Sequence, residues 1–190
     1  MRKGIQLVNL PFYTQRMTAE NWQEEGFSSL AEAESWSGRG CGIASLRMVL
    51  EGFGCACGGH WEMISKGLAA GAYKEGVGWI HGKLAEMAGD YGIFGEAKRG
   101  KTLANLQKDL ENGFVCIASV TPYFRFGQQK PDGSFYGKGG HLVPVYGCET
   151  EGGKAAYFLL HHPSMYAEYN VPHWAVAAEK FAPSFSGNYI

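Results

Sequence analysis

Sequence patterns typical of helices and of strands occupy different parts of this 190-residue chain, helices first and strands later. Apolar residues recur at helical spacing in three windows that each end near a glycine: 61–70, 79–91 and 103–111. Beyond Gly113 the apolar runs are short and indicate strands: 114–120, 141–147 and 155–161. A turn at 149–154 would join the last two strands as an antiparallel hairpin, and this separation is typical of the α+β class. Because no repeat or linker interrupts the chain, we expect a single domain over residues 1–190.

Composition narrows the possible partners and the compartment. Hydrophobic residues make up 45% of the chain, and the formal net charge of -1 gives no electrostatic reason to expect nucleic acid or an anionic membrane. No apolar run approaches the ~20 residues of a membrane span, and the first residues lack the apolar stretch of a signal peptide. The five cysteines show no paired spacing, which suits a reducing compartment. We therefore expect a cytoplasmic protein.

Cys41 follows a glycine-rich turn and begins a segment with helical periodicity. Its apolar face is predicted to comprise Ile43, Leu46, Val49, Leu50 and Phe53, and Gly52 and Gly54 end the pattern. A helix N-terminus stabilises a thiolate, so we expect the pKa of Cys41 to lie below the ordinary value of about 8.5. The position predicts a nucleophile. The alternative is a small buried side chain, as free cysteines often are.

A second segment contains a histidine that is a candidate catalytic partner for Cys41. His141 follows Gly139 and Gly140 and begins an apolar run that is too short for a helix and contains a proline, which predicts a strand. A helix-start cysteine and a strand histidine form papain-like sites, in which the imidazole is general base and then general acid. Three other histidines lack this context and are expected on the surface or in satisfied positions: His60, His81 and His173.

Gln15 supplies a third element of the predicted site. It follows a short predicted strand and turn and lies upstream of the cysteine. A side-chain amide directed at a developing oxyanion lowers the barrier to acyl transfer by roughly 3–4 kcal/mol. Gln15 is therefore a candidate donor to the oxyanion.

Three segments, in this order, resemble the papain-like peptidases of the bacteriocin-processing group, cysteine peptidase family thirty-nine: 11–15, 41–45 and 140–147. The tail at 181–187 is similar to the helix-to-strand ending of that domain. The resemblance implies a papain-like α+β fold with the site in a cleft between a helical half and an antiparallel sheet. It also implies a thiol peptidase that acts on a peptide or protein and needs no cofactor or metal.

One position departs from the family pattern. Where the family has an acid or asparagine before a proline, this chain has His162 before Pro163. A neutral imidazole can accept a hydrogen bond but supplies no fixed negative charge to the imidazolium. Three interpretations follow: a working Cys41–His141–His162 site, a catalytically weak or inactive peptide-binding domain, and a metal site made by these three side chains. The metal interpretation ranks lowest, because the spacing matches no dedicated zinc motif.

Other features bear on the substrate and on the remaining thiols. The aromatic-rich stretch 122–139 is either a lid that contacts a peptide or a hairpin packed on the sheet. Cys55, Cys57 and His60 form half a metal knuckle without a second ligand pair, while Cys116 lies in an apolar strand and is predicted to be core. No membrane segment accompanies the chain, so the Gly-Gly leader specificity of transporter-fused relatives cannot be transferred. An acyl or peptide transferase stays an alternative to a hydrolase.

Overall fold

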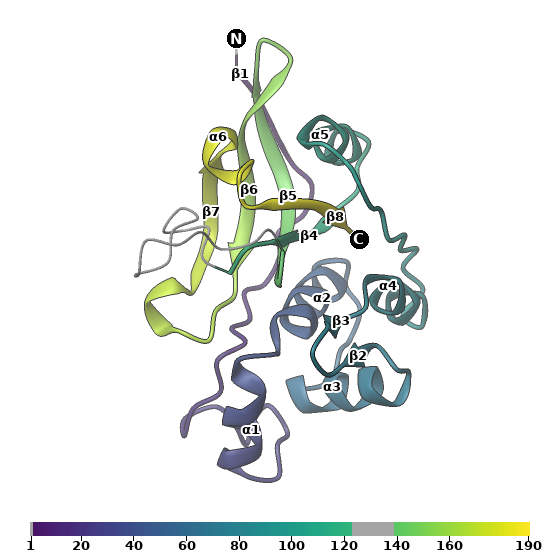
Figure 1. Cartoon of the computed structure of the whole chain (residues 1–190), viewed down its shortest axis with the longest axis vertical. Coiled ribbons are helices and arrows are strands. Elements are labelled where there is room, and N and C mark those ends of the chain that lie inside the picture. The colour runs from purple at the N-terminus through teal and green to yellow at the C-terminus, as the bar shows by residue number, and fades with distance from the viewer. Residues whose placement is uncertain (1, 123–138) are drawn as a thin grey trace.

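The computed structural model describes residues 2–122 and 139–190, and an antiparallel sheet forms its centre (Figure 1). The strands of this sheet lie in the order β7-β6-β5-β4-β8, and β1 pairs with β5 as well. Their bounds are β1 Arg2–Gln6, β4 Cys116–Val120, β5 His141–Glu151, β6 Lys154–His162, β7 Val171–Ala177 and β8 Phe185–Tyr189. Every pairing is antiparallel, which confirms the α+β prediction.

The helices gather mainly at one end of the sheet, at the bottom of Figure 1. Four helices lie there: α1 Leu30–Ser37, α2 Cys41–Gly52, α3 His60–Ala69 and α4 His81–Gly89. A two-stranded hairpin, β2 Tyr73–Lys74 and β3 Gly78–Trp79, lies between α3 and α4. The others are α5 Leu103–Glu111, the 3-10 turn Ala167–Tyr169 and α6 Ala178–Phe181.

The sheet buries both of its faces, and each face contributes to a separate apolar core. On one face, Leu142 and Tyr146 of β5 pack with the apolar side of α2, including Ile43 and Leu46. On the other, alternate residues of the same strands pack with α5 and α6: Leu106, Leu110, Val143, Val145, Phe158, Leu160 and Phe181. Because side chains alternate along a strand, β5 anchors the two cores at once.

Helix α5 has the bounds that the sequence predicts, and its first turn explains why. The Thr102 hydroxyl accepts a hydrogen bond from the Asn105 backbone N–H, and the Asn105 side chain accepts one from the Thr102 N–H. This reciprocal capping box satisfies N–H groups that a helix start would leave open. Leu106 and Leu110 then direct the helix onto the sheet, where both are buried.

Other predictions were partly wrong, and tertiary contacts account for the differences. Trp79 does not begin a helix but ends the β2–β3 hairpin, and α4 starts at His81. Phe53 does not belong to the buried face of α2, because it caps the helix and is 44% exposed. Helix α1 and strand β7 were not predicted. The tail forms α6 and then β8, as the resemblance implied.

Two further expectations concern the membrane and the 122–139 segment. Within the described ranges, no helix is long and apolar enough to cross a membrane. The aromatic stretch expected to form a lid or a hairpin falls almost entirely at 123–138, outside the described residues.

Two buried histidines predict a loss of stability in acid. Burial lowers the pKa of His60 and of His161 to about 4, from 6.5. Between these pH values the two imidazoles bind protons in the unfolded chain but not in the folded one. The free energy of unfolding therefore decreases as pH falls below 6.5. We expect urea unfolding at pH 5 to give a free energy at least about 4 kcal/mol below that at pH 7.5, about 2 kcal/mol for each of these two histidines. His141 adds to this difference, because burial holds its pKa well below 6.5 as well. The variant His60→Gln should lose about 2 kcal/mol of this pH dependence, and equal stability at both pH values would contradict the prediction.

Candidate active site

Cys41 is the first residue of α2, and glycines on both sides let the backbone pass through a crowded place. A Cβ on Gly42 would lie 2.5 Å from Cγ of Trp79. A Cβ on Gly40 would lie 2.8 Å from Nε2 of His60. Any larger residue at either position would displace these rings, so the two glycines set where the thiol begins.

The turn before Cys41 is held by two hydrogen bonds to carbonyl groups, one partly buried and one buried. The indole Nε1 of Trp79 donates to the carbonyl of Arg39 at 2.6 Å. The amide Nε2 of Gln15 donates to the carbonyl of Ser37, also at 2.6 Å. Since a carbonyl only accepts, this bond assigns the amide orientation of Gln15 and leaves its second N–H available to a substrate. Its Oε1 has no hydrogen-bond partner among the described residues.

Two hydrogen bonds join α2 to the strand that carries the histidine. The Ser45 hydroxyl, one turn after Cys41, donates to the carbonyl of Leu142 at 3.0 Å. The Cys41 sulfur is also hydrogen-bonded to the backbone of Leu142. This hydrogen bond lowers the pKa of the thiol, so the donor is the N–H group of Leu142. Leu142 directly follows His141, so these bonds bring cysteine and histidine together although they lie far apart in the sequence.

His141 leads β5 out of a turn that only glycines form easily. Gly139 and Gly140 have φ values of +84° and +94°, in the region that side chains disfavour. The ring of His141 is hydrogen-bonded to the backbone of Pro163, and its Nε2 is buried without a partner among the described residues. Proline has no N–H, so its carbonyl accepts and Nδ1 of His141 donates. This tautomer leaves the lone pair on Nε2, the state required of a general base.

His162 lies beside His141, but its own ring is hydrogen-bonded to a different residue. The two rings meet edge-on, with centroids 4.8 Å apart and an interplanar angle of 62°. Nδ1 of His162 donates to the carbonyl of Tyr169 at 2.7 Å, which fixes its tautomer in turn. His162 therefore packs against the ring of His141, whereas the Pro163 carbonyl orients that ring. Nothing in the sequence pattern indicated Pro163, because a backbone carbonyl leaves no trace in residue identity.

The electrostatics of the pair differ from the sequence prediction. Burial raises the pKa of the Cys41 thiol to about 11, although the backbone N–H groups of Leu142, Gly42 and Cys41 itself oppose this. Burial also holds the pKa of His141 well below 6.5, and the neighbouring His162 lowers it further. The expected depression of the thiol pKa by the helix N-terminus is therefore wrong, because desolvation outweighs the helix dipole. At neutral pH the resting pair is a thiol and a neutral imidazole.

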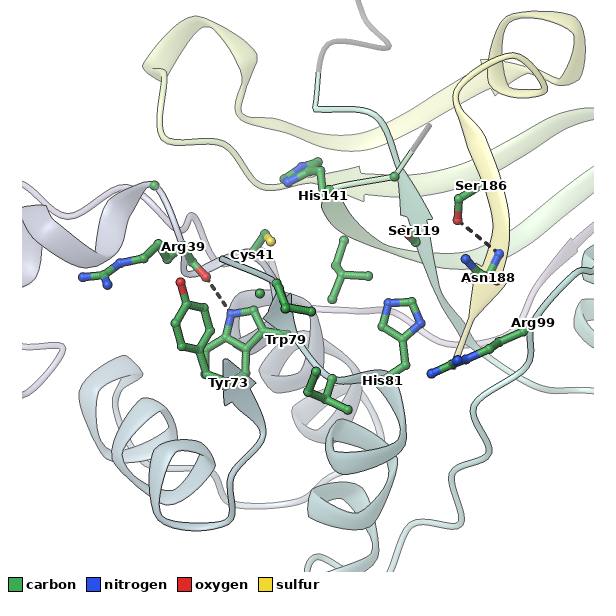
Figure 2. A pocket seen from close by; sticks show the side chains of 17 residues that line it. Arg39, Cys41, Tyr73, Trp79, His81, Arg99, Ser119, His141, Ser186 and Asn188 are labelled. Carbon is green, nitrogen blue, oxygen red and sulfur yellow. Dashed lines mark hydrogen bonds between the residues drawn. The ribbon is translucent and has the colours of Figure 1, made fainter. Parts of the chain in front are cut away.

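Two pockets meet at this pair. The larger, about 450 Å³, is the α4-side pocket shown in Figure 2, lined among others by Trp79, His81, Arg99, Ser119, Ser186 and Asn188. The smaller, about 180 Å³, is the Gln15-side pocket. Cys41 and His141 line both pockets, and Gln15 and His162 line the smaller one. The structure therefore brings all four predicted site residues to one cavity.

The remaining thiols and histidines lie outside these pockets or at their edges. The described part of the chain contains no group of three or more His, Cys, Asp or Glu side chains arranged to hold a metal, and all five cysteines are free. Cys116 is buried in β4, as predicted. His60 is neither at the surface nor satisfied. It is 1% exposed, and neither ring nitrogen has a partner among the described residues.

Comparison with known proteins gives one structural likeness. No family model matches the chain, and neither does any curated protein. A solved structure from Bacillus anthracis, provisionally described as a C39-like peptidase, superposes with a TM-score of 0.54 at 17% identity. The match covers 99% of this chain and 98% of that one. The chain thus has the fold of a C39-like peptidase, which agrees with the resemblance of its three segments.

The crowding beside Cys41 gives a paired prediction. Gly42 and Gly82 are each the second residue of a helix, but a Cβ at Gly82 would meet nothing within 4 Å. We expect Gly42→Ala to lower the free energy of unfolding by about 1–3 kcal/mol through overpacking against Trp79. Gly82→Ala should leave it unchanged or raise it by up to about 1 kcal/mol. Urea unfolding followed by tryptophan fluorescence measures both, and equal effects would contradict the crowding.

Proposed function

We propose that the chain is a cysteine peptidase or a related thiol amide hydrolase, with Cys41 as nucleophile and His141 as general base. The observation that carries the proposal is the pairing of these two side chains on the walls of both pockets, with the thiol bonded to the residue after His141. The fold of a C39-like peptidase supports the same chemistry. Its substrate would be a peptide or protein segment lying across Cys41.

In the first step, the resting neutral pair would act by general-base catalysis. As the sulfur attacks the substrate carbonyl carbon, Nε2 of His141 takes the thiol proton, because its lone pair has no other partner among the described residues. The carbonyl oxygen becomes an oxyanion. The spare N–H of Gln15 and the backbone N–H of Cys41, at the open start of α2, are the candidate donors to it.

In the second step, the same histidine returns the proton. The imidazolium of His141 protonates the departing amine nitrogen, the carbon–nitrogen bond breaks and a thioester on Cys41 is left. Water, deprotonated by His141, then attacks the thioester and releases the acid and the thiol. An amine in place of water would make the protein an acyl or peptide transferase.

A peptide-binding domain without turnover is the second candidate. The observation that favours it is the side chain beside His141, which is a histidine and lowers the imidazole pKa rather than supporting an imidazolium. Among the described residues, no aspartate or glutamate lines either pocket. The imidazolium formed in the first step would therefore depend on the Pro163 carbonyl dipole alone.

Removing one thiol at a time separates the two candidates. The full chain is incubated with a randomised library of acetylated octapeptides, and the products are identified by mass spectrometry. We expect Cys41→Ala to abolish cleavage while the unfolding free energy changes little. Cys55→Ala removes a half-buried thiol outside both pockets and should cleave at the wild-type rate. Peptides that bind wild type and Cys41→Ala equally, without cleavage by either, would favour the binding domain.

The unusual neighbour of His141 predicts a pH profile and a way to shift it. Since the pKa of His141 is lowered, its ring stays neutral below pH 6.5, and the acid limb of kcat/KM should lie below that value. His162→Asp would place a carboxylate beside the ring, and we expect it to move the acid limb upward by about one pH unit or more and to raise activity. His162→Asn is the uncharged control: it removes only the lowering by His162 and should move the limb upward by less than His162→Asp does. An acid limb that moves alike in both variants would show that charge is not the cause.

A further inference from the structure

The α4-side pocket contains positive charge without a matching negative one. Arg39 and Arg99 line it, and none of its lining residues among the described ones is acidic. Arg39 already interacts with Glu75 at 3.5 Å and lies over the Trp36 ring at 4.2 Å. Figure 2 shows Arg39 at one end of the pocket and Arg99 at the other. The two arginines are therefore not equivalent.

Arg99 has no ion-pair partner among the described residues, although its neighbour does. Lys98 forms a salt bridge with Asp109 at 2.8 Å and a longer one with Glu96 at 3.8 Å. The charge of Arg99 influences the pocket directly, because it contributes to lowering the pKa of His81. In Figure 2 its guanidinium extends toward the His81 ring. A cation held at a pocket wall without a counterion can pair with an anionic group of a ligand.

The backbone around Arg99 is fixed against β8, which places its side chain reproducibly. Lys98 exchanges two hydrogen bonds with Tyr189, of 2.7 and 3.0 Å, and Lys101 N–H donates to the carbonyl of Gly187 at 2.8 Å. Gly187 has a φ of +83°, and a Cβ there would lie 2.9 Å from the Lys101 carbonyl oxygen. The glycine thus permits the close approach of the two segments. Arg99 lies between two anchored residues.

A polar group beside Arg99 completes the arrangement. The Asn188 Oδ1 accepts a hydrogen bond from the Gly100 N–H at 3.3 Å, and the Asn188 N–H donates to the Ser186 hydroxyl at 3.2 Å. With its oxygen turned to Gly100, the amide nitrogen of Asn188 is left as a donor. A guanidinium with an adjacent amide donor is suited to a carboxylate.

From this arrangement we propose that the α4-side pocket is a carboxylate subsite in which Arg99, with Asn188 and His81, binds an acidic group of the substrate. The inference rests on the proposed function of Cys41. The pocket would select peptides that carry a carboxylate on the β8 side of the scissile bond. That carboxylate is either an Asp or Glu side chain or the free C-terminus of the substrate.

Two matched peptide pairs distinguish the sources. The best-cleaved octapeptide from the library is remade with Glu or Gln at the position toward β8, and with a free acid or an amide at its C-terminus. We expect kcat/KM to fall about tenfold or more for Glu to Gln if the side chain is read, or for acid to amide if the terminus is read. Equal rates across both pairs would overturn the subsite while leaving the proposed function intact.

Charge reversal assigns the preference to one residue. In Arg99→Glu the preference for the carboxylate should disappear and a Lys at that position should be favoured instead. Lys108→Glu, on the exposed side of α5 and outside both pockets, changes the net charge equally and should keep the wild-type preference. A preference that survives in Arg99→Glu would overturn the assignment.

A binding measurement tests the subsite independently of cleavage. The ¹⁵N-labelled full chain is titrated with N-acetylglutamate or with N-acetylglutamine, and the side-chain amide resonance of Asn188 is followed. We expect the acid to shift this resonance and the amide to leave it in place, and Arg99→Gln should abolish the shift. If the shift occurs but no peptide is cleaved, the subsite stands and the proposed hydrolase fails. If neither probe shifts the resonance, the subsite is wrong.

Discussion

The contact between α2 and β5 is the interaction on which the site depends. The Ser45 hydroxyl donates a hydrogen bond to the carbonyl of Leu142, and the Cys41 sulfur accepts one from the backbone of the same residue. These bonds join a helix from the first third of the chain to a strand that begins a hundred residues later. The apolar side of α2 packs on the same face of β5, so burial and hydrogen bonding set one register. Without it, Cys41 and His141 would not line the same pockets.

The strand β5 also holds His141 in place within a stable sheet. Its alternate residues belong to two cores, one shared with α2 and the other with α5 and α6. Movement of β5 would therefore disturb packing on both faces, and a close-packed interior resists such movement. His141 stands at the very start of this strand, after two glycines with left-handed backbone angles. His141 is thus carried by a strand that is packed on both faces.

Much of this arrangement could be predicted from residue patterns, and the exceptions have physical causes. The Thr102 cap, the helix starting at Cys41 and the Gly-Gly-His strand are local signals, and the structure contains all three. Strand β7 escaped prediction because it gains its order from pairing with β6 rather than from its own alternation. The protonation of the pair could not be predicted either. Helix position argues for a thiolate, but the degree of burial that reverses this is a property of the assembled fold.

That protonation has a consequence for the lifetime of the molecule. The deprotonated form of cysteine attacks peroxides and disulfides, so susceptibility to oxidation follows thiolate content and access. A sulfur with a pKa of about 11 offers such oxidants little thiolate to react with at neutral pH. A thiol that stays protonated at rest would survive oxidising conditions that modify a permanent thiolate. The burial that raises the pKa of the Cys41 thiol thus also protects the sulfur from oxidation at rest.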